Sequence, residues 1–444
     1  MSTIEKHDMT QGKILLPLVS FTIPLVLGNL FQLTYNAADS VIVGKYVGEQ
    51  ALAAVGTSTP IMNIAILLIS GMCMGASVLM SSQYGAKDYD TLSRQISTTM
   101  LAGCGFSVVF SLLMLLLANP VLRLIRVPET AIPEAAAYLR IIFMGLIFTF
   151  MYNFLANTMR ALGDSKTPLY FLVTSAFLNI FGDLFFVVVL RWGVAGSAIA
   201  TVCSEGLCCL LCGIYIKKKI PLLCLGKKWW VFDKSLLGKT VSYGSTSAMQ
   251  QVCLQLGKLI IQSVVNTQGV AVMAAFTAVN RVDDFAYTPQ QNIGHAMTTF
   301  LAQNKGAGHK ERMKKGFQTG LLIELVYSVG LFCVIWGLAP QIMTLFAEDG
   351  DAQVVSLGIS YLHLISWMYI LPGLTNGVQG FFRGIGDLKV TLYSTFMNMF
   401  GRVVAVFVMI RLLQMEFASL AWANMVGWIV MLLFEAVSYT HLTL

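Results

Sequence analysis

Long apolar runs separated by short polar segments make up most of this chain. About 20 apolar residues are enough for a helix to cross the hydrocarbon core of a membrane. Counting the runs that are bounded by charged residues, Gly or Pro gives twelve candidate spans, which begin near Ile14, Ala51, Ile96, Pro133, Pro168, Val194, Leu236, Val270, Gly316, Val354, Leu388 and Phe417. The pattern predicts an all-α integral membrane protein with twelve transmembrane helices, because only helices and closed barrels satisfy backbone polar groups in lipid.

The composition excludes a soluble globular domain. Of the 444 residues, 56% are hydrophobic and 11% are charged, whereas soluble domains have roughly 25% charged residues. Cys209 and Cys212 form a CxxC pattern inside an apolar run with no His or second pair nearby, so we expect buried thiols rather than a metal site. The first apolar run is too long for the core of a signal peptide, so no cleaved signal is expected.

The basic residues of the connecting segments predict the orientation of the spans. Lys and Arg gather in alternate segments, in a set that includes Lys13, Lys87, Arg94, Arg160, Lys166, Lys217, Lys234, Lys305, Lys315, Arg383 and Lys389. The positive-inside rule places these segments, and with them both termini, in the cytoplasm. The net charge of +7 is then a property of the cytoplasmic loops and indicates no nucleic-acid partner.

The chain contains an internal repeat. The segment Arg160–Tyr170 matches Arg383–Tyr393, and the run LNIFGD ending at Asp183 matches MNMFGR ending at Arg402. Six spans per half is an even number, so the halves share one orientation and are parallel repeats related by a pseudo-two-fold axis along the membrane normal. We predict two six-helix bundles: an N-terminal lobe with a cation site, residues 1–220, and a C-terminal lobe, residues 221–444.

The two halves differ in their intramembrane charges. A gapless match from Gln32 and Gln255 pairs Asp39 with Gln262, and Asp183 pairs with Arg402. A carboxylate inside a span costs at least about 2.5 kcal/mol on insertion scales, and such residues usually mark ion or proton sites. Carboxylates that only joined helices would be expected in both halves. The asymmetry therefore favours a cation site in the first half, with an interhelical polar staple as the alternative.

Several polar residues can reach the same depth. At a rise of 1.5 Å per residue, Asp183 is about 24 Å above a cytoplasmic start near Thr167, and Thr201 lies about 12 Å below the outer end of its span. Asp39, Asn179, Asp183 and Thr201 then form the candidate site, with Asn153 as the nearest further partner and Asn157 as a weaker one. Carboxylate, amide and hydroxyl oxygens suit Na⁺, and paired carboxyls can share a proton. The sequence leaves Na⁺ and H⁺ open.

Other charged residues lie within apolar runs. Lys258, Glu324 and Arg402 are expected to line the second lobe, and for them a snorkelling or paired structural role is as plausible as substrate contact. A structural role is favoured for Arg281, Asp283 and Asp284, and a packing role for Glu205 and Glu435. The pairs Arg160/Asp164 and Arg383/Asp387 are expected to hold cytoplasmic loops and helix ends.

The ordered set of motifs resembles the multidrug and toxic compound extrusion (MATE) transporters over essentially the whole chain. It consists of the two six-span lobes, the spacing of Pro24 and Asp39, the RxxGDxKxP loop, Asn179 with Asp183, and GVAGSAIAT ending at Thr201. The resemblance is nearest to the prokaryotic DinF-like branch and implies a bacterial or archaeal plasma membrane. It also implies a first-lobe cation site at Asp39, Asn179, Asp183, Thr201 and Asn153 or Asn157. The seventh span departs from the NorM-like branch, since it holds Gln250, Gln251 and Gln262.

Pro24 lies inside the first span and removes a helical hydrogen bond, so a bend is expected there. The resemblance implies that this helix bends as the cation site fills. We expect a multi-pass secondary antiporter that exports small cationic or amphipathic organic compounds, including drugs, in exchange for H⁺ or Na⁺. It needs no cofactor, contacts membrane lipid and works as a monomer.

Two other functions remain open at this point. A lipid-linked saccharide flippase has the same two-lobe plan, but should carry more cationic residues in its cavity. A membrane-embedded enzyme could use Asp39 and Asp183 as acid and base. The motifs GxxxxGK[ST], HExxH and GxSxG are absent, which argues against a P-loop ATPase, a zinc protease and a serine hydrolase.

Overall fold

The computed structural model describes residues 8–125, 127–129, 131–220, 230–346, 352–413, 417 and 419–443. These residues are almost entirely helical, and none of them lies in a strand. Contacts divide the chain into two compact units, unit 1 with residues 1–8 and 23–248 and unit 2 with residues 9–22 and 249–444. The predicted lobe boundary after residue 220 falls at the edge of the undescribed segment 221–229, so it stays a prediction.

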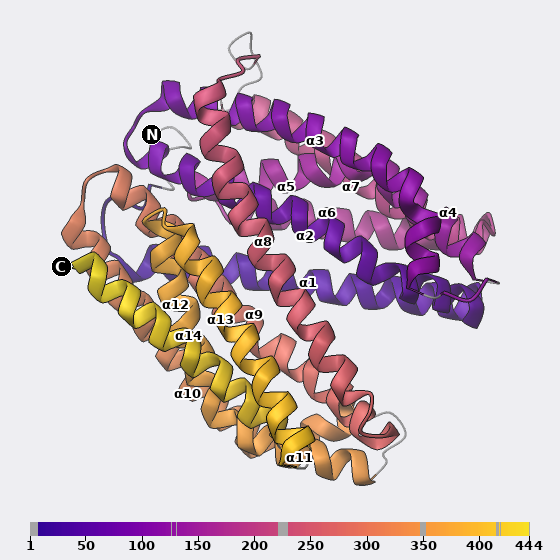
Figure 1. Cartoon of the computed structure of the whole chain (residues 1–444). Coiled ribbons are helices and arrows are strands. Elements are labelled where there is room, and N and C mark those ends of the chain that lie inside the picture. The colour runs from indigo at the N-terminus through magenta and orange to yellow at the C-terminus, as the bar shows by residue number, and fades with distance from the viewer. Residues whose placement is uncertain are drawn as a thin grey trace. The chain divides into compact units, whose positions relative to one another are not determined.

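The helices of the first half follow the predicted spans closely (Figure 1). They are α1 (Leu15–Tyr46), α2 (Glu49–Gly85), α3 (Tyr89–Leu124), α4 (Ile132–Met144), α5 (Leu146–Ala161), α6 (Lys166–Asp183), the π-helix η2 (Leu184–Val189) and α7 (Gly193–Lys219). Helices α4 and α5 bend by 47° at Gly145 and form one broken span.

The second half repeats this order. Its helices are α8 (Lys234–Val265), α9 (Val270–Gly306), α10 (Lys310–Phe346), α11 (Ala352–Ser366), the short 3-10 turn η6 (Trp367–Tyr369), α12 (Ile370–Gly384), α13 (Leu388–Phe407), the π-helix η7 (Val408–Leu412) and α14 (Ser419–Thr443). Helices α11, η6 and α12 together make one span, Ala352–Gly384.

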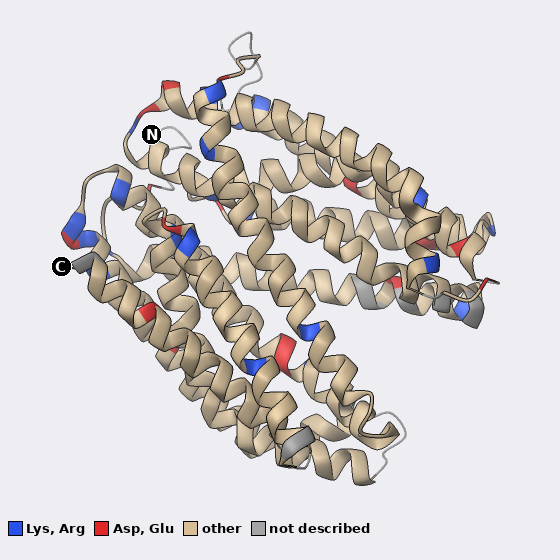
Figure 2. Ribbon diagram, viewed as in Figure 1, with Lys and Arg blue, Asp and Glu red and all other residues tan. Residues whose placement is uncertain are grey.

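The twelve predicted spans are thus twelve long helical segments. By length and hydropathy alone, nine described helices qualify as membrane spans, or ten with the broken pair α4 and α5. The two long helices that do not qualify are α8 and α9, which carry more polar residues than the others. Charged residues gather at helix ends in both units, and a smaller number lie within the spans, most visibly in unit 2 (Figure 2).

The loop motif of the repeat forms the same structure twice. Gly163 and Gly386 both have left-handed backbones, with φ of 90° and 84°, which suits glycine. The following aspartates cap the next helix: Asp164 accepts hydrogen bonds from the backbone amides of Lys166 and Thr167, and Asp387 accepts one from Val390. The two carboxylates thus occupy the helix-end role that the sequence indicated.

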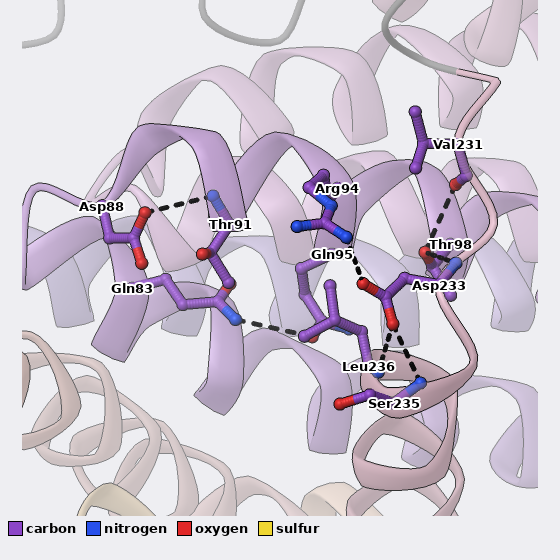
Figure 3. A network of polar contacts seen from close by, with 10 residues as sticks. All are labelled: Gln83, Asp88, Thr91, Arg94, Gln95, Thr98, Val231, Asp233, Ser235 and Leu236. Atoms are coloured by element: carbon purple, nitrogen blue, oxygen red, sulfur yellow. Dashed lines mark hydrogen bonds and ion pairs between the residues drawn. The ribbon is translucent and has the colours of Figure 1, made fainter.

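The first turn of α8 is tied to α3 by a polar network within unit 1 (Figure 3). Arg94 pairs with Asp233 at 2.5 Å, and the Thr98 hydroxyl accepts a hydrogen bond from the backbone amide of Asp233. Deeper in the same interface, the Gln95 amide donates to the Thr240 hydroxyl. Asp88 caps α3 by accepting from the Thr91 amide, and these hydrogen bonds lower the pKa of the Asp88 carboxyl.

The start of the chain is attached to unit 2 in a similar way. The Met9 amide donates to Gln303, and Asn304 donates to the Met9 carbonyl. Arg312 donates to the backbone carbonyls of Met9, Gln11 and Gly12. Residues 9–22 therefore belong to unit 2, whereas α1 belongs to unit 1 from residue 23 onward.

Pro24 lies just after this change of packing partner, and α1 continues through it without interruption. The bend expected at Pro24 therefore stays a prediction. A helix deforms most easily where a proline removes a backbone hydrogen bond. In α1 this point lies next to the residue at which the helix changes its packing partner.

Candidate functional site

Glycines at the contact between α6 and α7 bring the candidate residues together. A Cβ on Gly182 would meet Ala200 at 3.0 Å, and one on Gly196 would meet the backbone oxygen of Phe186 at 3.0 Å. Small residues allow such close approach of helices within a membrane. Asp183 ends α6 directly before the π-helix η2, and its carboxylate interacts with Ser197 in the first turns of α7.

Ser197 connects the two carboxylates of unit 1. Its hydroxyl donates to Asp39 Oδ1 on α1 at 2.7 Å, and both Ser197 and Asp39 interact with Asp183. Asp183 is 0% exposed, and neither of its carboxylate oxygens has a hydrogen-bond donor. The two aspartates from α1 and α6 thus face a common point, as the sequence predicted, and no cationic side chain is paired with them among the described residues.

Asn179 and Thr201 form the second layer of the cluster. The Asn179 amide nitrogen donates to Thr201 Oγ1 at 3.2 Å, and the Thr201 hydroxyl donates to the Ser197 carbonyl at 3.1 Å. Asn179 Oδ1 is buried without a partner. With Asp183, this leaves three buried acceptor oxygens that have no donor. Buried polar atoms are nearly always satisfied, so a proton or a cation fits this arrangement.

Asn153 and Asn157 use their amide groups differently. Asn153 donates to the Thr149 carbonyl at 2.9 Å, and Asn157 donates to the Asn153 carbonyl at 2.8 Å. Both bonds stay within α5, and no described hydrogen bond joins either residue to Asp39 or Asp183. Their assignment to the cation site therefore stays a prediction, with less support than the assignments of the other four residues.

The structure adds residues that sequence reasoning did not assign to the site. Ser197 is one of them, although it lies four residues before Thr201 and therefore on the same helical face. Tyr138 of α4 is buried and lies near Asp39, Asp183 and Glu205. Only the packing of α4 reveals it.

Glu205 lies in a polar environment, whereas the sequence predicts a packing role for it. It lies four residues after Thr201 on α7, accepts a hydrogen bond from the Thr149 hydroxyl at 2.5 Å and interacts with Tyr35 of α1. It thus belongs to the polar face of α7 that includes Ser197 and Thr201. The signal available in the sequence was this spacing of four residues.

The corresponding positions of unit 2 hold no carboxylate. Gln262 donates to Asn266 at 2.7 Å in an exposed position, and Arg402 replaces Asp183. Asp283 is the buried carboxylate near Arg402, and it accepts hydrogen bonds from Tyr369 and Tyr361 at 2.5 and 3.2 Å. Asp284 lies 3.5 Å from Lys258. Each of these two acidic residues thus has a basic residue of another helix near it, Arg402 for Asp283 and Lys258 for Asp284.

Comparison with known proteins identifies the fold and the family. The family profile described as MatE matches residues 24–185 and 247–408, one match in each half of the chain. The chain belongs to the MATE family. It is a membrane transporter and not an enzyme, so a catalytic role for Asp39 and Asp183 is set aside. The two matches also agree with the internal repeat.

Individual relatives extend over nearly the full chain. The probable multidrug resistance protein YpnP of Bacillus subtilis (strain 168) is 32% identical over 392 residues, which cover 88% of this chain and 86% of that protein. Solved structures of MATE in the straight and in the bent conformation both give a TM-score of 0.91 at 22% identity and cover all of this chain. They cover 100% and 99% of those chains, respectively. The MATE fold, all-α with two six-helix bundles, is thereby confirmed.

Proposed function

We propose that this MATE transporter exports small organic compounds, including cationic or amphipathic drugs, in exchange for H⁺ or Na⁺ moving inward. The observation that carries the proposal is the Asp39–Ser197–Asp183 cluster with its unsatisfied acceptor oxygens. The similarity to YpnP, a probable multidrug resistance protein, supports organic compounds as the substrate class. The carboxylates of unit 1 argue against a flippase, which has an anionic pyrophosphate to hold.

The energetics of such an exchange are sufficient. One positive charge moving down a potential of ~150 mV releases about 3.5 kcal/mol. Each 1.4 kcal/mol corresponds to a tenfold concentration ratio, so one ion sustains a gradient of a few hundred-fold for a substrate without net charge. A monocationic substrate that leaves in a one-for-one exchange cancels the charge movement, so its export draws on the concentration gradient of the ion.

The inward ion is proposed to bind at Asp39, Asn179, Asp183 and Thr201, with Asn153 and Asn157 as outer candidates. Neutralising the two carboxylates removes the repulsion between Asp39 and Asp183, and this changes the force on α1. Pro24 lies where α1 changes from unit 2 to unit 1, so the strain concentrates there and bends the helix. The existence of relatives solved in a straight and in a bent conformation is in line with this step.

The remaining parts of the proposal concern the whole chain. It works as a monomer in a bacterial or archaeal plasma membrane, with both termini in the cytoplasm. The basic loops that include Lys87, Lys166 and Lys305 support this orientation. Residues 1–220 and 221–444 act as the two lobes that give alternating access.

The test is ion-driven transport by Asp39→Asn in everted or reconstituted vesicles, with Na⁺ and pH gradients imposed separately. We expect ethidium or norfloxacin transport to fall to background, because the amide cannot take up a proton or charge-balance Na⁺. The matched control is Gln262→Ala, the counterpart position in the second half, which should retain most transport. Wild-type transport by Asp39→Asn would refute the assignment, and equal losses in both variants would remove the asymmetry argument.

A further inference from the structure

Unit 2 contains a buried carboxylate that the proposed exchange does not use. Glu324 of α10 is 0% exposed, and neither of its side-chain oxygens has a hydrogen-bond donor. None of the ion pairs among the described residues includes it. Glu324 therefore neither snorkels to the surface nor forms an ion pair among the described residues, which removes one of the two alternatives that the sequence left open. A permanent charge at such a position is costly, so the carboxyl is neutral or is balanced by a bound cation.

A glycine provides the space beside this carboxylate. At Gly373 of α12, the position of a Cβ lies 2.8 Å from Ser328 Oγ, 3.2 Å from Gln290 Nε2 and 3.4 Å from Glu324 Oε2. Three polar side chains, one from α9 and two from α10, thus converge on a single point. The methyl group of an alanine at residue 373 would occupy that point, whereas glycine leaves the space between the three polar atoms open.

The neighbours of Glu324 are oriented by their own hydrogen bonds. The Gln290 amide nitrogen donates to Ser328 Oγ at 3.1 Å and to the Tyr369 carbonyl at 2.8 Å. Gln290 Oε1, on the same amide group, is buried without a donor. Ser328 donates to the Glu324 carbonyl at 2.7 Å. The cluster therefore offers three unsatisfied acceptor oxygens, two from Glu324 and one from Gln290, as the cluster of unit 1 does.

The titratable groups around Glu324 are tyrosines. Tyr327, on the same helix, interacts with Glu324 and donates its hydroxyl to the Ala286 carbonyl of α9. Tyr369 of η6 donates its hydroxyl to Asp283, so it is committed elsewhere. From α12 the packed positions are Gly373 and Gly377, which bring no charge. Nothing recorded in the described part of unit 2 neutralises the Glu324 carboxylate.

We infer that Glu324 and Gln290 form a second site for a monovalent cation, H⁺ or Na⁺, in unit 2. The carboxyl releases its proton when Na⁺ enters and takes it up when Na⁺ leaves, so charge is conserved within the cluster. No group of three or more His, Cys, Asp or Glu among the described residues could hold a metal ion, which argues against a divalent occupant. As a step of transport, the inference rests on the proposed antiport and raises the number of ions that can be exchanged per cycle.

The test is infrared difference spectroscopy of the purified protein, because it detects a protonated carboxyl directly. Spectra are recorded on raising the pH without Na⁺ and, separately, on adding NaCl against choline chloride at constant pH. The background is Asp39→Asn with Asp183→Asn, which removes both carboxyls of the unit 1 cluster. In this background we expect a protonated-carboxyl band that is lost with rising pH. Adding Glu324→Gln should remove one component of that response and leave the components of other buried carboxyls such as Glu435 and Asp283. Loss of the band on adding NaCl at constant pH indicates exchange of the proton for Na⁺, whereas loss only on raising the pH indicates proton release alone.

The possible results separate the two proposals. If Glu324→Gln leaves the difference spectrum of the background unchanged, the second site is refuted, whatever the transport result. If the background itself transports at the wild-type rate, the proposed unit 1 site fails, and the effect of Glu324→Gln on the spectrum still decides the second site. Elution as a single sharp species on size-exclusion chromatography shows that each variant is folded.

A second variant tests the geometry without changing a charge. Gly373→Ala places a methyl group where the three polar atoms converge and should weaken Na⁺ binding about tenfold, in the range seen when groups around a bound ion are disturbed. Gly330→Ala, on α10 with open space around it, is the matched control and should bind like the wild type. If Gly373→Ala binds Na⁺ with wild-type affinity while folded, the cluster does not hold the ion.

Discussion

Two fully buried aspartates, Asp183 in unit 1 and Asp283 in unit 2, have opposite surroundings. Asp183 has no hydrogen-bond donor, and its charged neighbour is another carboxylate, Asp39. Asp283 accepts from two tyrosine hydroxyls and lies near Arg402. Burial alone therefore does not distinguish them. The difference lies in whether donors and a cation are supplied by the protein itself.

This difference teaches how to separate a structural carboxylate from one that binds an ion. The donors to Asp283 are themselves fixed, since Asn424 donates to Tyr361 at 2.9 Å. A charge held in this way is compensated in every state of the protein. At Asp183 the compensation has to come from outside, so its occupancy can change during a cycle. By the same criterion, Glu324 resembles Asp183 rather than its neighbour Asp283.

The largest difference is expected between two single variants, Asp183→Asn in unit 1 and Asp283→Asn in unit 2. Asp183→Asn should reduce ion-driven efflux to background, at least about tenfold, because a neutral amide needs no proton or cation to be buried. Asp283→Asn should leave the ion dependence of transport unchanged and lower stability by about 1–3 kcal/mol, since a buried hydrogen-bond network is disturbed. Efflux rates per folded transporter and thermal unfolding of the purified variants measure the two effects.

The pair of variants is decisive because each is the control of the other. If Asp283→Asn abolished ion coupling while Asp183→Asn only lowered the unfolding temperature, the roles assigned to the two units would be reversed. Equal loss of coupling in both would mean that the hydrogen bonds around Asp283 do not mark a structural residue.

An intermediate effect is expected at Ser197, which joins the two carboxylates of unit 1. Ser197→Ala removes the 2.7 Å hydrogen bond to Asp39 but keeps both charges. The apparent affinity for the coupling ion should change roughly threefold to tenfold, equivalent to about 1 kcal/mol for a lost hydrogen bond, while the maximal rate is retained. Transport as a function of Na⁺ or H⁺ concentration measures this. Ser204→Ala, whose hydroxyl bonds only within α7, is the control. A lost maximal rate with unchanged ion affinity would contradict a positioning role.

Much of this comparison could be predicted from the sequence. The apolar runs predicted twelve spans, and the family comparison confirms that fold. Asp39 and Asp183 stood out because a carboxylate in an apolar run is visible without knowledge of packing. Their absence from the second half was visible in the repeat, since Gln262 and Arg402 take their places.

The remaining features depend on contacts between helices. Tyr138 lies in a span with no local signal and interacts with the site only through the packing of α4. Asp283 accepts hydrogen bonds from tyrosines of η6 and α11 and lies near Arg402 of α13, all far from it in the sequence. The environment of Glu324 depends on the glycine at residue 373, far along the chain. Spacing within one helix does not contain this information.

The smallest effect is expected where the two halves are alike. Asp164 accepts hydrogen bonds from two backbone amides, at 3.1 and 3.0 Å, at the start of α6. Its repeat partner Asp387 accepts one, at 3.5 Å, at the start of α13. Substituting a capping residue with Ala costs about 0.5–2 kcal/mol, so Asp164→Ala should lower the unfolding temperature more than Asp387→Ala. The shared loop motif then contributes unequally to stability, and ion affinity should be unchanged in both. Altered ion affinity in either variant would show that this loop acts in transport and not only as a helix cap.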